Sequence, residues 1–239
     1  MIPEPELIQS RSVVVLVSAN SEWEIVLSIL NPAKVDKTPL GDCFIHQLAG
    51  DTLLFLHSGW GKVRSAAAAQ YVIDTFNPQL MINLGTCGGF EGYTQIGEIL
   101  LAESMVIYDI FERMGDPEDA IDRYRSRLDT SWLPESLPEG TRRATIGSAD
   151  QDIDFNNYNL LTEKFMLTAA DWESAPIGWV AQTNRVSCLI LRGVSDLVGP
   201  NSSETDANHA LWKARARQIM HKLLDDLPFY LKSFSELQN

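Results

Sequence analysis

Acidic side chains in this sequence stand where apolar segments give way to polar residues. An apolar run typical of a buried strand precedes Asp196, and a second such run precedes Glu22 and Glu24. A third acid, Glu173, opens a predicted helix. Buried parallel strands are nearly continuous apolar runs, and open α/β sheets bind ligands beyond the carboxyl ends of such strands. We therefore expect these acids to converge on one edge of a sheet.

Carboxyl groups gathered at one sheet edge can divide the work of cleaving a glycosidic bond. Burial raises the pKa of a carboxyl group, so a half-buried Asp196 could hold a proton near neutral pH and give it to a leaving group. A second carboxylate could activate water, and a third could hold hydroxyl groups. The three carboxyl groups for this chemistry would be those of Glu173, Asp196 and either Glu22 or Glu24.

The same acids also have a purely structural interpretation. Aspartate is a preferred N-cap residue, so Asp196 could cap the next helix. Acidic residues favour the first turn of a helix because they complement its dipole, which would account for Glu22, Glu24 and Glu173. The sequence leaves both interpretations open.

Apolar periodicity and turn residues predict strands that alternate with helices. The predicted strands cover residues 12–17, 43–48, 52–57, 80–84, 99–101, 105–108, 144–148 and 186–192. The predicted helices cover residues 22–30, 65–76, 156–165, 172–184 and 203–235. This alternation indicates an α/β protein with a mostly parallel central sheet in a single domain.

Two segments depart from this pattern. Residues 1–10 are predicted to form a short polar arm. Residues 112–142 are rich in Asp, Glu, Arg and Pro with weak periodicity. We interpret them as a surface excursion that is partly helical. The sequence does not decide whether it is a lid, a subunit contact or neither.

Composition excludes several classes of partner. The formal net charge of −13 opposes binding to nucleic acid or to an anionic membrane. No apolar run approaches the length of a membrane span. The three cysteines are widely spaced and odd in number, which favours reduced thiols in the cytoplasm. The four histidines have no metal-ligand spacing, so we expect no metal site built from them.

Three glycine-containing segments follow predicted strands and are interpreted as turns. They are 58–61, 85–89 and 147–150. Glycine permits positive φ and close approach of the backbone to a ligand. None of the three matches the dinucleotide fingerprint or the P-loop, since Lys62 is followed by valine rather than a hydroxyl residue.

Five blocks of this sequence, in order, resemble the nucleoside phosphorylase superfamily, and within it the 5′-methylthioadenosine/S-adenosylhomocysteine nucleosidases most closely. The blocks are Ser58–Val63, Ile82–Gly89, Ile96–Leu100, Asp171–Ala175 and Arg192–Asp196. The resemblance implies a three-layer α/β/α sandwich around a mixed, partly barrel-like central sheet. It also implies a homodimer that uses neither metal nor cofactor.

The resemblance assigns roles to individual residues. Asp196 matches the acid that protonates N7 of the leaving purine, and Glu173 matches the glutamate that binds the ribose hydroxyls. Thr86 matches a residue beside the nucleophilic water, and the main chain of Ile153 matches a contact to the adenine edge. Glu22 matches the glutamate that activates water. Burial is then expected to keep Asp196 protonated while Glu22 stays ionised.

Glu24 is the rival to Glu22 for the water-activating role. We favour Glu22 because Ile25 and Val26 then follow it by three and four residues and face the core. The resemblance further places Cys87, Gly88 and Ser195 at the substrate site.

Two candidate substrate-binding residues depart from the family pattern. Asp152 replaces an aromatic residue that stacks on the base, and Trp172 replaces a methionine that packs on the ribose. Asp152 could point to solvent or accept hydrogen bonds from an exocyclic amine. Trp172 could supply apolar surface through its large ring.

The residues near the expected water site favour hydrolysis over phosphorolysis. Phosphate needs a cationic cradle, whereas Asn83 and Glu22 stand where related phosphorylases carry basic elements. Lys62 and Arg64 are the cations nearby that could restore phosphate binding. Futalosine-type hydrolases commonly carry Asn where Asp196 stands, so Asp196 favours a 6-aminopurine.

The sequence thus predicts a nucleosidase that hydrolyses an adenine nucleoside such as 5′-methylthioadenosine or S-adenosylhomocysteine. A phosphorylase that uses phosphate is one alternative. A nucleoside-binding module that has lost turnover is another, because a fold does not fix a function.

Overall fold

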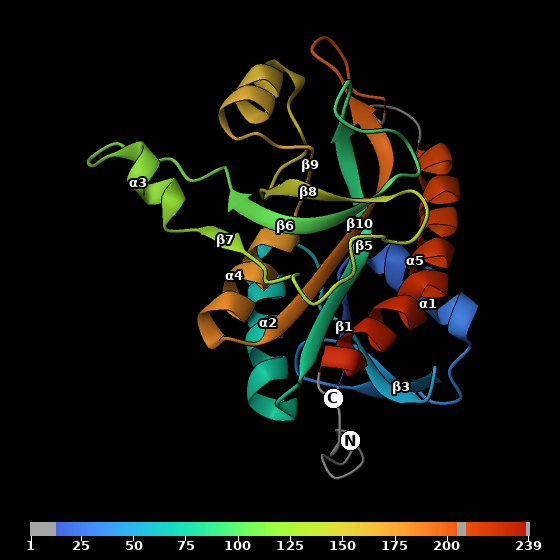
Figure 1. Ribbon diagram of the computed structural model, residues 1–239. Coiled ribbons are helices and arrows are strands. Elements are labelled where there is room, and N and C mark those ends of the chain that lie inside the picture. Colours follow the sequence, from blue (N-terminus) through green and yellow to red (C-terminus); the bar gives the residue numbers. More distant parts are fainter. Residues whose placement is uncertain (1–12, 205–208, 238–239) are drawn as a thin grey trace.

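The computed structural model describes residues 13–204 and 209–237. The predicted polar arm at 1–10 lies outside these residues, as does part of the predicted start of the last helix. Strands and helices alternate along most of the described chain (Figure 1). The strands are β1 (Val13–Val17), β2 (Asp36–Lys37), β3 (Asp42–Leu48), β4 (Asp51–His57), β5 (Leu80–Phe90), β6 (Ile99–Ile107), β7 (Arg125–Arg127), β8 (Thr141–Ser148), β9 (Ala169–Asp171) and β10 (Ser187–Val198). The helices are α1 (Asn20–Leu30), α2 (Lys62–Phe76), α3 (Pro117–Asp122), α4 (Ser174–Asn184) and α5 (His209–Leu237).

All described strands belong to one mixed sheet. The order is β10-β6-β8-β9-β5-β1-β4-β3-β2, with β7 paired to β6. β10 also pairs with β5, so β5, β10, β6, β8 and β9 form a closed circuit. This circuit is the partly barrel-like region that the family resemblance implies, and the predicted fold class is confirmed.

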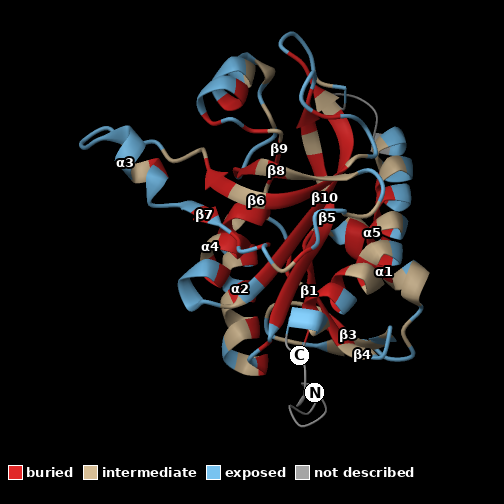
Figure 2. Cartoon of the chain, in the orientation of Figure 1, coloured by how far each residue is buried: buried red, intermediate tan, exposed pale blue. Residues whose placement is uncertain are grey.

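Alternating side chains of the central strands create two apolar layers. In β1, Val14 and Leu16 pack on the side of α2 and α4. Val13, Val15 and Val17 pack on the side of α1 and α5. Period-two alternation explains how one fully buried strand supplies both faces. Figure 1 shows these helix pairs on opposite sides of the sheet, and Figure 2 shows the buried strands between them.

The strands predicted at 43–48 and 52–57 and the turn predicted at 58–61 are present. β3 and β4 pair antiparallel around Ala49 and Gly50, which both have positive φ. Gly59 and Gly61 also have positive φ, so residues 58–61 form a turn.

The predicted turn at 85–89 is wrong. These residues continue β5, which pairs with β10 on one side through Arg192↔Gly85 and Gly193↔Thr86. The glycine at position 85 lets other side chains approach the backbone closely and does not form a turn. A Cβ on Gly85 would lie 2.0 Å from Arg192 Nη1 and 2.9 Å from Glu22 Oε2.

The predicted end of the last strand is also wrong. β10 runs through Asp196 to Val198, and α5 begins only at His209, so the helix-cap interpretation of Asp196 does not hold. Val194 pairs with Cys87 and Asp196 with Gly88, which leaves Ser195 as an extra residue. Such a bulge re-aims the side chains beside it.

Other differences concern the middle of the chain. One continuous strand, β6, replaces the two predicted at 99–101 and 105–108. A 3₁₀ turn over Phe155–Asn157 and a π-helical turn over Leu160–Lys164 replace the predicted helix at 156–165. The excursion at 112–142 contains α3, which projects from the body in Figure 1. It also contains β7, which returns to the sheet beside β6.

No helix in the described part of the chain has the length and apolar character needed to cross a membrane.

Candidate active site

Glu22 lies in the first turn of α1, directly after β1. Its carboxylate Oε1 accepts hydrogen bonds from the backbone N–H of Thr86 at 2.6 Å and from the Thr86 hydroxyl at 2.7 Å. Glu22 is buried, together with Ile25 and Val26, whereas Glu24 is exposed. The helical period therefore turns Glu22 toward β5 and Glu24 toward solvent.

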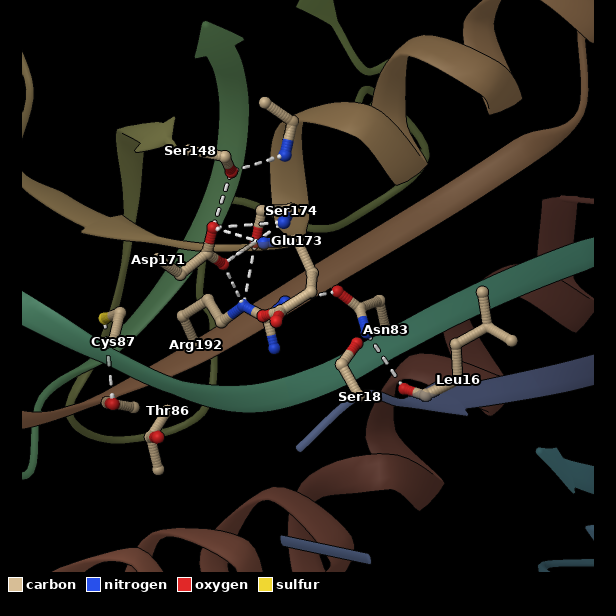
Figure 3. A network of polar contacts seen from close by, with 12 residues as sticks. Leu16, Ser18, Asn83, Thr86, Cys87, Ser148, Asp171, Glu173, Ser174 and Arg192 are labelled. Atoms are coloured by element: carbon tan, nitrogen blue, oxygen red, sulfur yellow. Dashed lines mark hydrogen bonds and ion pairs between the residues drawn. The ribbon is translucent and has the colours of Figure 1, made fainter. Parts of the chain in front are cut away.

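Arg192 is a buried cation in the middle of β10. Its Nε donates to Asp171 Oδ2 at 2.5 Å and to Ser174 Oγ at 2.8 Å, and its Nη2 donates to Asn83 Oδ1 at 2.6 Å (Figure 3). Asn83 in turn donates to the Leu16 carbonyl at 3.0 Å. A buried guanidinium needs such paired acceptors because an uncompensated buried charge is very costly.

Asp171 is the carboxylate that pairs with this cation. Besides Arg192, it accepts hydrogen bonds from the Ser148 hydroxyl at 2.5 Å and from the backbone N–H groups of Glu173 at 3.1 Å and Ser174 at 3.0 Å. It thus joins the end of β8 to the start of α4 and fixes the backbone that carries Glu173.

Glu173 occupies the N-cap position of α4 and is buried. Its Oε1 accepts a hydrogen bond from the backbone N–H of Gly61 at 3.1 Å. Burial, reinforced by the negative charge of Asp171, raises the pKa of Glu173 to about 8, although Arg192 acts in the opposite direction. The glycine turn at 58–61 therefore holds a carboxyl group that is protonated over much of the acidic and neutral range.

This raised pKa predicts how stability depends on pH. The folded protein holds the Glu173 proton more tightly than the unfolded chain, whose glutamate has a pKa of 4.5. The stabilisation is therefore complete below pH 4.5 and is lost as pH rises through about 8. Glu173→Gln keeps the carbonyl oxygen for Gly61 but carries no titrating proton. We expect its melting temperature above pH 8 to exceed that of the wild type.

Differential scanning calorimetry across the pH range tests this prediction. The two melting temperatures should converge as the pH approaches 4.5. A constant difference at all pH values would show that Glu173 does not titrate in this way.

Burial also raises the pKa of Glu22. The neighbouring Arg192 and the two donors of Thr86 lower it, but burial is the larger effect. Glu22 is therefore a stronger base than an exposed glutamate, and it ionises against a high desolvation cost with Arg192 beside it. A general base works best when its pKa lies near the working pH.

Asp196 of β10 is paired with Gly88 of β5. The Ser195 hydroxyl is 2.6 Å from Asp196 Oδ1 and 3.2 Å from the Cys87 carbonyl oxygen. A Cβ on Gly88 would lie 2.8 Å from Ile153 Cδ1 and 3.4 Å from Asp196 Oδ2. Ile153 and Asp196 therefore both lie close to Gly88, and a side chain at this position would clash with Ile153.

β5 connects the three acids. Thr86 binds Glu22, Gly88 faces Asp196, and Gly85 approaches Arg192, which pairs with Asp171 beside Glu173. The structure thus brings Glu22, Glu173 and Asp196 to one region at the carboxyl ends of β1, β9 and β10. The side chain of Cys87 is turned away, with its Sγ 3.7 Å from the Gly193 carbonyl oxygen.

Trp172 and Asp152, the two residues that depart from the family pattern, have different surroundings. The Trp172 ring stacks on Trp60, with ring centroids 5.1 Å apart and an interplanar angle of 23°. Trp60 is 62% exposed, so this aromatic pair lies at the surface next to Glu173. Asp152 is exposed, and no described contact joins it to the acids.

The nearby cations are already engaged. Lys62 Nζ pairs with Asp109 and lies 3.7 Å from Asp150 Oδ2. Arg64 donates to the Leu40 carbonyl at 2.6 Å. Arg192 is held by Asp171. Among the described residues near the site, these basic groups are therefore not arranged as a cradle for phosphate.

Arg192, Asp171 and the Gly61 amide had no role predicted from the sequence. The available signal was an arginine within an otherwise apolar strand, because a charge on a buried strand must have a buried partner. A buried arginine therefore predicts an acidic residue close to Arg192, but the sequence does not identify that residue.

The fold and the site define an α/β protein with several buried carboxyl groups around one arginine at the carboxyl ends of its strands. The sequence model of the Phosphorylase superfamily matches residues 13–227, and the chain belongs to this superfamily.

Curated relatives that match most of this chain include nucleosidases. A 5′-methylthioadenosine/S-adenosylhomocysteine nucleosidase from Marinomonas sp. (strain MWYL1) is 25% identical over 209 residues, which cover 81% of this chain and 90% of the relative. The nucleosidase of that name from Aeromonas salmonicida (strain A449) is 26% identical over 203 residues, or 79% of this chain and 88% of the relative.

Among solved structures, the Campylobacter jejuni nucleosidase of the same name superposes with a TM-score of 0.73 at 21% identity. The superposition covers 95% of this chain and 100% of the other. Futalosine hydrolase from Helicobacter pylori gives a TM-score of 0.75 at 18% identity and covers 93% of this chain and 98% of the other. At these identities the structures show a shared fold.

Proposed function

We propose that this protein is a single-domain purine nucleosidase that hydrolyses the N-glycosidic bond of an adenine nucleoside such as 5′-methylthioadenosine or S-adenosylhomocysteine. It acts in the cytoplasm as a homodimer without metal or cofactor. One observation carries the proposal: a single strand, β5, places Thr86 on Glu22 and Gly88 beside Asp196. Curated relatives named as such nucleosidases support it.

The proposed reaction is dissociative. The bond between C1′ and N9 stretches, and the sugar develops oxocarbenium character. Glu173 orders the ribose hydroxyls, and Asp196 gives its proton to N7 of the departing purine. Glu22 takes a proton from a water molecule, whose oxygen bonds to C1′. Each proton transfer contributes about 10²–10⁴-fold to the rate.

The residues around the water position favour hydrolysis over phosphorolysis. Glu22 would repel a phosphate, and the cations that could offset this repulsion already pair with carboxylates or a carbonyl. A water molecule needs a base rather than a cation, and Glu22 with a raised pKa provides one.

Release of free adenine, measured with and without phosphate, tests the proposal. We expect adenine from methylthioadenosine, S-adenosylhomocysteine or adenosine at a rate that does not depend on phosphate. Release only with phosphate would establish a phosphorylase. Tight binding without release would establish a binding module, and a preference for inosine would contradict the 6-aminopurine assignment.

The two rival glutamates of α1 give a matched pair of variants. Glu22→Gln removes the proposed base, so we expect turnover to fall by about 10²–10⁴-fold. Glu24→Gln changes an exposed side chain two residues away and should keep wild-type turnover. Steady-state adenine release measures both variants. Equal activity of Glu22→Gln and the wild type would remove Glu22 from the mechanism.

A further inference from the structure

A second arginine contacts the backbone at the β10 bulge, and the proposed mechanism does not use it. Arg215 of α5 donates through Nη1 to the Ser195 carbonyl oxygen at 3.0 Å. The same guanidinium pairs with Glu204, whose carboxylate oxygens lie 2.9 Å from Nη1 and 3.4 Å from Nη2. Ser195 directly precedes Asp196, so this arginine holds the chain on one side of the proposed acid.

Glu204 holds the chain on the other side of Asp196. Its carboxylate Oε2 accepts from the backbone N–H of Leu197 at 3.3 Å. Its own backbone N–H donates to the Leu197 carbonyl at 3.1 Å. The Glu204–Arg215 pair therefore binds the residue before and the residue after Asp196.

A bulge creates the need for such a restraint. The extra residue, Ser195, falls out of the regular pairing between β10 and β5. Its carbonyl belongs to a residue that is only 1% exposed, and a buried carbonyl without a partner is costly. A hydrogen bond from a charged donor is stronger than one from a neutral donor, so Arg215 fixes this carbonyl firmly.

The donor, Arg215, belongs to a helix that is packed against the strand it contacts. α5 packs closely on β10: a Cβ on Gly193 would lie 2.1 Å from a methyl carbon of Ile219, one helical turn beyond Arg215. Glu204 also balances the charge of Arg215. The pair can therefore fix geometry without placing a net charge beside the carboxyl group of Asp196.

We propose that Arg215 and Glu204 are positioning residues that hold the backbone on both sides of Asp196, so that its carboxyl group keeps its place beside Gly88. This inference rests on the proposed function, in which Asp196 is the proton donor. Small misplacements of a catalytic group cost up to about 10²-fold in rate.

The test compares Arg215→Ala, Arg215→Lys and Glu204→Gln with a control, Arg217→Ala. Arg217 lies on the same helix but is exposed. We expect Arg215→Ala to lower kcat for adenine release by about 10–100-fold with KM little changed. Its melting temperature should fall modestly, because the buried Ser195 carbonyl loses its donor. Arg215→Lys should recover part of the loss because an ammonium can still donate to the carbonyl. Arg217→Ala should match the wild type.

Hydrogen exchange provides a readout that does not depend on turnover. The Leu197 amide should exchange faster in Glu204→Gln than in the wild type, because a neutral amide oxygen is a weaker acceptor than a carboxylate. An unchanged kcat in Arg215→Ala, or parallel losses of kcat and melting temperature without recovery in Arg215→Lys, would overturn the inference. Absence of adenine release from the wild type would instead overturn the proposed function.

Discussion

Replacing Asp196 with asparagine is expected to abolish most adenine release while nucleoside binding survives. An amide at this position can form a hydrogen bond with N7 but cannot transfer a proton to it. The loss in kcat should be about 10²–10⁴-fold, which is the usual contribution of a positioned acid. The neighbouring Ser195 hydroxyl, 2.6 Å from the carboxyl group, can contact an amide oxygen in the same place.

Two measurements separate chemistry from binding in this variant. Single-turnover adenine release gives the chemical rate, and isothermal titration calorimetry gives the nucleoside affinity. Near-normal affinity with a large loss of rate is the expected result. A variant that keeps most of the wild-type rate would show that another group protonates the purine.

Arg192→Met is expected to have the largest effect on stability. Arg192 is 1% exposed, and its side chain compensates the buried charge of Asp171. Removing one partner of a buried ion pair costs about 3–5 kcal/mol, because the other charge stays buried without compensation. Urea denaturation should show this loss, and the same change at exposed Arg217 should cost little.

A second substitution tests whether the uncompensated charge is the cause. Asp171→Asn in the Arg192→Met background removes the carboxylate that lost its partner, so the double variant should recover part of the stability. If the two losses simply add, the ion pair is not the source of the effect.

The sequence predicted much of the framework because local patterns decide it. The continuous apolar run of β1 predicted a buried strand, and the period of α1 distinguished buried Glu22 from exposed Glu24. The Ala49-Gly50 turn between β3 and β4 and the glycine turn at 58–61 also follow from local chemistry.

Errors arose where pairing between distant strands overrode local signals. Residues 85–89 contain glycines that are typical of a turn, yet they continue β5 because β10 pairs with them. The last strand was likewise predicted to end before Asp196, but β10 continues through it because it pairs with β5. A strand that pairs along its whole length tolerates glycine and polar residues that would end an isolated one.

The partners of Arg192 could not be predicted from spacing. Asp171 is 21 residues away along the chain and Asn83 is 109 residues away, so no helical or strand period relates them. Only the closed circuit of strands brings these side chains together. A buried arginine in an apolar run indicates that partners must exist, but the topology decides which residues they are.

A crystal structure with adenine and a ribose mimic bound tests the central claim most directly. We predict that an oxygen of Asp196 lies about 2.6–3.2 Å from N7, that Glu173 contacts the sugar hydroxyls, and that Glu22 contacts a water molecule facing C1′. A ligand bound away from β5, or one that leaves any of these three acids without contact to base, sugar or attacking water, would contradict the account.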